Sequence, residues 1–150
     1  MERDSHFVSL ERMYLAGPIN DLFRPSIRIA EGEAVIEMEA SPKFFHAGAA
    51  LHGSVYFKML DDAAFFAANS LERDRFVLTT SFNIYLLGPV TSGRLQARGR
   101  VVHRTRSQFI AEAVLEDEEG KTVARGSGVF VRSLKRLAEA VGYGPGDPTD

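Results

Sequence analysis

The apolar residues of this chain follow a helical period in one long stretch near its middle, from Ser54 to Asn69. This stretch contains neither glycine nor proline, and its apolar residues recur at the spacing of a helical face. Alanine, valine and phenylalanine also occupy the remaining faces, which is typical of a helix buried inside a domain. Two adjacent aspartates, Asp61 and Asp62, interrupt the apolar surface about 100° apart around the helix axis. We therefore predict that one of them has a function.

On both sides of this helix the apolar residues follow a period of two, which is typical of strands. A hairpin is predicted from Ile27 to Met38, around a turn at Glu31 and Gly32. After the helix, alternation predicts a strand from Phe76 to Leu86, which a Gly-Pro pair ends. The remaining predicted elements are strands at 95–101, 109–115 and 122–132, a short amphipathic helix at 4–14, one or two helical turns at 134–141, and a frayed end at 142–150.

This order of elements predicts the α+β class. An antiparallel sheet of five to six strands has one natural way to bury a helix that is apolar on most sides, which is to wrap around it. We therefore expect one long central helix inside the sheet, preceded by a short N-terminal helix. The 150 residues suit a single domain, with its core at about 26–133, which removes roughly 70% of the extended-chain surface from water.

The composition is that of an ordinary globular protein, with 45% hydrophobic and 25% charged residues. A net charge of −2 favours neither nucleic acid nor an anionic membrane as a partner. The chain has no cysteine, so disulfides and thiol nucleophiles are excluded. We find no signal-peptide pattern and no apolar run of roughly 20 residues, and we expect a cytoplasmic protein.

Candidate chemistry begins where the long helix begins. His52 and Gly53 precede it, so the first free N–H groups of the helix are available to a ligand carbonyl that gains negative charge. Asp61 follows Gly53 by eight residues, which separates them by about 12 Å along a straight helix. If both are catalytic, they must come from two chains whose helices run antiparallel about a two-fold axis. Purely structural roles are the alternative: a plain helix start, an Asp61 that accepts hydrogen bonds from a strand, and an Asp62 paired with Lys58.

Two further groups of residues carry possible chemistry. His46 and His52 are candidates for a general base or a carbonyl donor, but the third ligand that zinc usually needs is not evident, so we predict no metal site. The only dense basic stretch runs along the predicted strand at 95–101 and the turn after it, and consists of Arg94, Arg98, Arg100, Arg104 and Arg106. On strand spacing, several of these arginines can pair with Glu112 and Glu116 of the next strand. The turn lacks an evident acidic partner and is a candidate phosphate site, made of Arg104, Arg106 and Ser107.

The segment HGSVYFKMLDDAAFFAANS, together with the later segments NIYLLGP and GRLQARGRVVHRTRS, resembles hotdog-fold acyl-CoA thioesterases of the phenylacetic-acid-degradation type. The resemblance covers roughly residues 31–132, and it is specific because order, spacing and flanking strands agree. It implies hydrolysis of an acyl-CoA or acyl-carrier thioester by an obligate homodimer or a dimer of dimers. No cofactor is implied beyond the coenzyme A of the substrate itself.

The resemblance also implies roles for individual residues. Asp61, counted from His52, would activate water or attack the thioester carbon, while the Gly53 N–H polarises the carbonyl. Thr79 falls where the family often has a hydroxyl that orients the water. His46 replaces the family's asparagine and Ser54 its second glycine, and together with His52 they are implied to contact the substrate. The coenzyme A phosphates are implied to contact Arg104, Arg106 and Ser107.

Two other functions remain open at this stage. A hotdog hydratase or dehydratase would use an imidazole with a carboxylate, and His46 with Asp61 would supply that pair. A non-catalytic module would keep the cleft and bind acyl-CoA without turnover. Four bulky residues are candidates to line or shorten an acyl pocket, although most phenylalanines in such a fold are core: Phe44, Phe45, Phe57 and Phe65.

Overall fold

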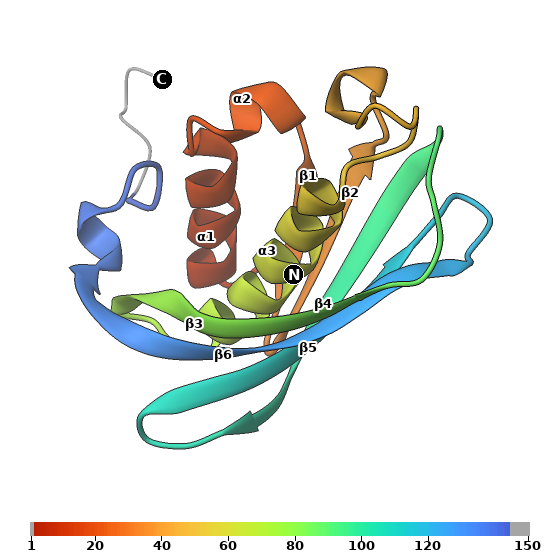
Figure 1. Ribbon diagram of the computed structural model, residues 1–150. Coiled ribbons are helices and arrows are strands. Elements are labelled where there is room, and N and C mark those ends of the chain that lie inside the picture. The colour runs from red at the N-terminus through yellow and green to blue at the C-terminus, as the bar shows by residue number, and fades with distance from the viewer. Residues whose placement is uncertain (1, 145–150) are drawn as a thin grey trace.

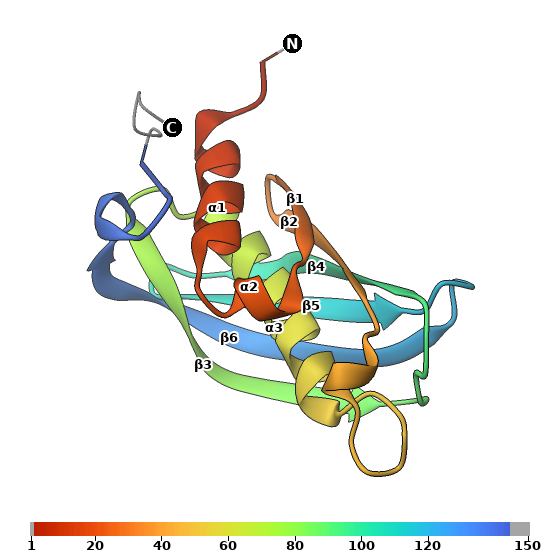
Figure 2. The ribbon, with the colours of Figure 1, turned by 90° about the horizontal axis from the view of Figure 1, so that it is seen from above.

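The computed structural model describes residues 2–144 of the chain. Six strands form one antiparallel sheet in the order β1-β2-β4-β5-β6-β3. Figures 1 and 2 show the long helix α3 lying in the concave face of this curved sheet, with α1 beside it. The helices are α1 (Ser5–Ala16), α2 (Asn20–Phe23) and α3 (Gly53–Ser70), and the strands are β1 (Ser26–Ala30), β2 (Glu33–Glu39), β3 (Arg75–Leu86), β4 (Arg94–Arg104), β5 (Gln108–Glu116) and β6 (Thr122–Arg136). The predicted α+β hotdog architecture is confirmed.

Helix α3 is the centre of the core because small residues let it lie close to the sheet. Ala63, Ala64, Ala67 and Ala68 are fully buried along it. A side chain on Gly99 of β4 would place its Cβ 2.2 Å from the Ala63 carbonyl oxygen, so the strand and the helix backbone touch at this point. Around this contact, the core is closed by large residues from every layer, including Leu10, Ile36, Leu60, Leu95, Phe109, Leu115 and Phe130.

The C-terminal region differs from its prediction. The helical prediction for 134–141 is wrong at its start, because β6 continues to Arg136, whose register partner is Arg75 of β3. Only a short 3-10 turn, Leu137–Glu139, follows. The expected fraying is wrong for residues 142–144, which pack on α1: Tyr143 bonds His6 at 2.7 Å, and the Gly144 carbonyl accepts from Arg12. The rest of the predicted frayed end, 145–150, lies outside the described residues.

Strand β3 ends the sheet on one side, and several large apolar side chains are exposed along this edge. Large side chains along it and just after it remain exposed, with Leu78 49%, Tyr85 65% and Leu87 54% accessible. An edge strand of twelve residues with exposed apolar groups is suited to pairing with another strand. Within the described residues, no helix is long and apolar enough to cross a membrane.

Candidate active site

The Asp61 carboxyl lies at the middle of α3 and faces β3. Its Oδ1 accepts a hydrogen bond from the Thr79 hydroxyl at 2.8 Å. Burial raises the pKa of Asp61 from 3.8 to about 6, and the nearby negative charge of Asp62 acts in the same direction. The Thr79 hydrogen bond and the Lys58 charge oppose this shift. A carboxylate with this pKa is ionised at neutral pH and basic enough to take a proton.

Asp61 and Thr79 both line a cavity of about 410 Å³. Its other walls are mostly apolar, and α1, α3, β3 and the C-terminal segment all contribute to them. Phe65 anchors the aromatic part of the wall, with ring centroids 5.0 Å from Phe66 and 5.2 Å from Phe76, both edge-on. The apolar lining consists of Met13, Ile19, Phe65, Phe66, Phe76, Leu78, Ala140 and Val141. This is the lining expected for an apolar ligand beside one reactive carboxylate.

A second group of polar side chains lies on the same wall. Asp62 Oδ2 accepts a hydrogen bond from the Tyr14 hydroxyl at 2.7 Å and forms an ion pair with Lys58 Nζ at 2.5 Å. The predicted pairing of Lys58 with Asp62 is thereby confirmed. Asn20, buried beside them, donates from Nδ2 to the Tyr14 carbonyl, while its Oδ1 has no hydrogen-bond partner among residues 2–144. We refer to Tyr14, Lys58 and Asp62 as the Asp62 cluster.

His46 and Gly53 lie in a different cavity, of about 430 Å³, at the start of α3. Gly53 is the first residue of the helix, and His52 caps it, because His52 Nδ1 accepts from the Ser54 N–H at 3.0 Å. His46 Nδ1 accepts from the Gly48 N–H at 2.9 Å. A neutral His46 therefore carries its proton on Nε2 and can donate from that atom.

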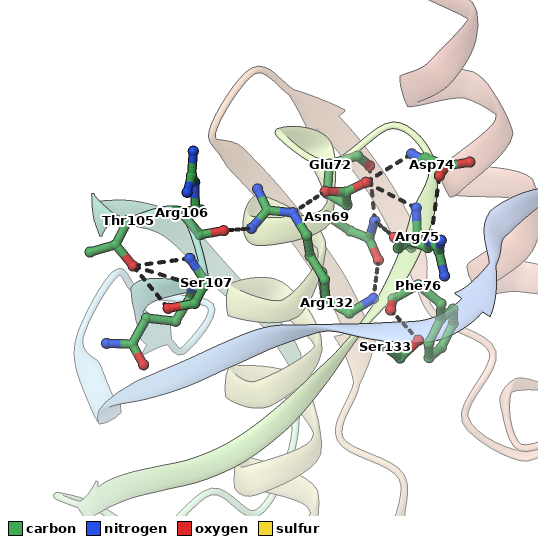
Figure 3. A network of polar contacts seen from close by, with 12 residues as sticks. Asn69, Glu72, Asp74, Arg75, Phe76, Thr105, Arg106, Ser107, Arg132 and Ser133 are labelled. Carbon is green, nitrogen blue, oxygen red and sulfur yellow. Dashed lines mark hydrogen bonds and ion pairs between the residues drawn. The ribbon is translucent and has the colours of Figure 1, made fainter.

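The basic turn between β4 and β5 lines neither of these two cavities of the single chain. Figure 3 shows how it is held: Arg132 on β6 donates from Nη1 to the Arg106 carbonyl at 2.6 Å and forms an ion pair with Glu72. Glu72 in turn accepts hydrogen bonds from the backbone that follows α3. Among the described residues, neither Arg104 nor Arg106 has an ion pair, whereas Arg100 on the same strand pairs with Glu112. Arg132 thus holds the backbone of the turn, and Arg104 and Arg106 beside it are uncompensated within the described residues.

The profile of the thioesterase superfamily matches residues 48–124 of the chain, which span α3, β3, β4 and β5. The chain belongs to the thioesterase superfamily. The expected enzyme class, a thioesterase, is therefore confirmed.

Relatives of this thioesterase agree with the assignment. A 1,4-dihydroxy-2-naphthoyl-CoA hydrolase from Listeria monocytogenes is 28% identical over 96 residues, 63% of this chain and 78% of the relative. The E. coli PaaI protein from the phenylacetic acid degradation operon superposes with a TM-score of 0.81 at 22% identity, covering 88% of this chain and 96% of its own. A thioesterase from Haemophilus influenzae superposes with a TM-score of 0.73 at 18% identity, and the match covers 80% of this chain and 85% of the other. At these identities the two structures establish the shared fold.

The fold of this thioesterase brings together some predicted site residues and separates others. Asp61 meets Thr79, and His46 lies near Gly53, but the two pairs line separate cavities. Sequence reasoning did not place Tyr14 or Asn20 beside Asp61, since both come from a region far from α3 in the chain and carry no local signal. Of the four bulky phenylalanines proposed for an acyl pocket, only Phe65 lines the Asp61 cavity. Phe57 packs edge-on against Phe82, and Phe44 stacks on Phe23.

Proposed function

We propose that this thioesterase hydrolyses an acyl-CoA thioester at a site shared by two protomers. Asp61 of one protomer and Gly53 of the other would lie on either side of the thioester carbonyl. The observation that carries this proposal is the separation of Asp61 and Gly53 into two cavities of one chain, each of which holds half of the groups that hydrolysis needs. The exposed apolar edge of β3 supports pairing of two chains beside α3.

In the proposed site each residue has one role. The free N–H of Gly53 and the Nε2 proton of His46 stabilise the oxyanion that forms when the carbonyl is attacked. Asp61 takes the proton of the attacking water or attacks the carbonyl carbon itself, and Thr79 orients the carboxylate. Water cleaves the carbon–sulfur bond, so the acid is released and the thiolate of coenzyme A takes up a proton.

The rest of the substrate is assigned to the surrounding residues. The acyl group occupies the Asp61 cavity, whose aromatic wall around Phe65 favours a bulky or aromatic group. His52 and Ser54 border the thioester at the start of α3. The phosphates of coenzyme A bind the uncompensated turn made of Arg104, Arg106 and Ser107, which Arg132 supports. The assembly is a homodimer, or a dimer of two such dimers.

The Asp61→Asn variant tests the catalytic assignment. Removing the base should lower free-thiol release by about 10²- to 10⁴-fold across aryl and alkyl acyl-CoA substrates, while substrate binding measured by calorimetry persists. Asp74→Asn, at an exposed aspartate outside both cavities, is the matched control and should keep the wild-type rate. An Asp61→Asn protein that releases thiol at the wild-type rate would refute the assignment. If the wild-type chain binds these thioesters without releasing thiol from any of them, the binding-module function replaces hydrolysis, and conversion of the acyl chain without thiol release would indicate a hydratase.

Mixing two inactive variants tests the shared site. Gly53→Pro removes the N–H at the first helical position, where proline is tolerated, and the extended backbone of His52 suits a following proline. Gly53→Ala adds a side chain but keeps the N–H, so it is the matched control. In a heterodimer of Asp61→Asn and Gly53→Pro chains, one of the two sites has both wild-type groups. Mixing should therefore restore thiol release, and a mixture that stays as inactive as its components would place both groups in one chain.

A further inference from the structure

Asp61 and Asp62 place two carboxyl groups in the wall of one cavity. Two neighbouring carboxylates normally resist simultaneous ionisation, because each charge makes the other costlier. Burial in a largely apolar cavity strengthens this repulsion. A base at Asp61 is useful only if it is ionised at the working pH, so the charge of Asp62 must be compensated within the cavity.

The Asp62 cluster supplies this compensation through a single oxygen. The Lys58 ammonium and the Tyr14 hydroxyl both bind Asp62 Oδ2, at 2.5 and 2.7 Å. Lys58 is itself held in place, since its Nζ lies 5.2 Å from the centroid of the Tyr14 ring and 5.1 Å from that of Phe23. Its side chain is only 13% exposed, so solvent screens the pair weakly.

Within residues 2–144, the other elements around the cavity bring no further charge. β3 contributes the Thr79 hydroxyl, α2 and the residue before it contribute Asn20 and Ile19, and the C-terminal segment contributes Ala140 and Val141. The charged and titratable groups that line the cavity are therefore Asp61 and the three members of the Asp62 cluster. Because Lys58 and Asp62 cancel, the cavity keeps one net negative charge, which belongs to Asp61.

We propose that Lys58 and Tyr14 are positioning residues, which act through Asp62: both hold its carboxylate and Lys58 cancels its charge, so that Asp61 works as a single ionised base. This proposal rests on the proposed function. The directions of the pKa contributions at Asp61 agree with it, since Asp62 raises the pKa of Asp61 and Lys58 lowers it. Lys58 and Tyr14 would thus set the lowest pH at which the enzyme works.

The pH dependence of kcat/KM tests the proposal. Lys58→Met should move the acidic limb to higher pH by about one unit, because Asp62 is then uncompensated, and Tyr14→Phe should move it less in the same direction. Asp62→Asn should move the limb to lower pH. Lys58→Arg keeps the charge and should restore the wild-type limb. The double variant Lys58→Met with Asp62→Asn loses both charges and should also return close to wild type.

The structure offers a matched control and a second readout. Lys135 and Glu139 form another lysine–acid pair at the same separation in sequence, but both are exposed, so Lys135→Met should leave the limb unchanged. The ¹³C titration of the Asp61 carboxyl in the same variants reports its protonation without turnover. This readout separates the two proposals. An Asp61→Asn protein that still hydrolyses thioesters would refute the proposed function, whereas the titration of Asp61 in the wild-type background tests the role of Lys58 and Tyr14 on its own.

Opposite shifts of the Asp61 titration midpoint in Lys58→Met and Asp62→Asn support the proposal. Loss of activity or of thermal stability without a shift of the midpoint would overturn the proposal. It would show that the Asp62 cluster only holds α1 against α3. If Lys58→Met does not fold, the Asp62→Asn variant tests the proposal by itself. An Asp61 titration midpoint that stays at its wild-type value in that variant would also overturn the proposal.

Discussion

At the scale of single residues, Asp61 is a compromise between stability and chemistry. The folded protein holds its carboxyl in a largely apolar cavity, so the folded state binds the proton more tightly than the unfolded chain does. Ionisation therefore disfavours folding as the pH rises from about 4 to about 6, and the cost persists above that range. A carboxylate kept at this cost is typical of a functional site.

Asp61→Asn should consequently stabilise the protein at pH 8. The asparagine carries no charge to bury, and because Asp61 is partly accessible we expect a gain of about 1 to 2 kcal/mol in the free energy of unfolding. Near pH 4 the wild-type carboxyl is largely protonated in the folded state, so the gain should shrink. Urea unfolding of both proteins at the two pH values measures this, and a gain that does not depend on pH would show that the charge is not its source.

At the scale of elements, α3 is placed by the small residues of its neighbours. The periodicity of residues 54–69 correctly predicted this helix, and alternation correctly predicted the strands that surround it. Their contact depends on Gly99, where β4 has no room for a side chain against the Ala63 carbonyl. The helix and the sheet are therefore in backbone contact close to Asp61.

Gly99→Ala should lower the free energy of unfolding by at least about 2 kcal/mol, because the added methyl overlaps the backbone of α3. Gly88→Ala is the matched control, since its Cβ would come no closer than 3.8 Å to a neighbouring atom. Chemical denaturation of the two variants compares them directly. Equal stability of Gly99→Ala and wild type would mean that α3 and β4 are not in contact at this position.

At the scale of the whole molecule, the proposed site is complete only when two chains meet. A single chain exposes the apolar edge of β3 and separates Asp61 from Gly53. Pairing along this edge would cover the exposed side chains and bring the two halves of the site together.

Tyr85→Lys should weaken this pairing, because it places a charge on the exposed edge strand. Sedimentation should then show a smaller assembly, and thiol release should fall with it, while the chain itself stays folded because Tyr85 is 65% exposed in the single chain. Leu134→Lys changes a side chain that is 93% exposed on β6 and should keep both assembly and activity. An active, monomeric Tyr85→Lys protein would contradict the shared site.

The sequence by itself determined α3 and the alternation of the strands, because the period of apolar side chains follows from local backbone geometry. The sequence also marked the start of α3 as a candidate through its free N–H groups, and its resemblance to the thioesterases marked Asp61 and Thr79. The tertiary structure alone decided what surrounds Asp61. Tyr14, Asn20 and Val141 reach its cavity from the two ends of the chain, and β6 runs on to Arg136 because β3 pairs with it. Such contacts depend on how complete surfaces pack, and no local pattern encodes them.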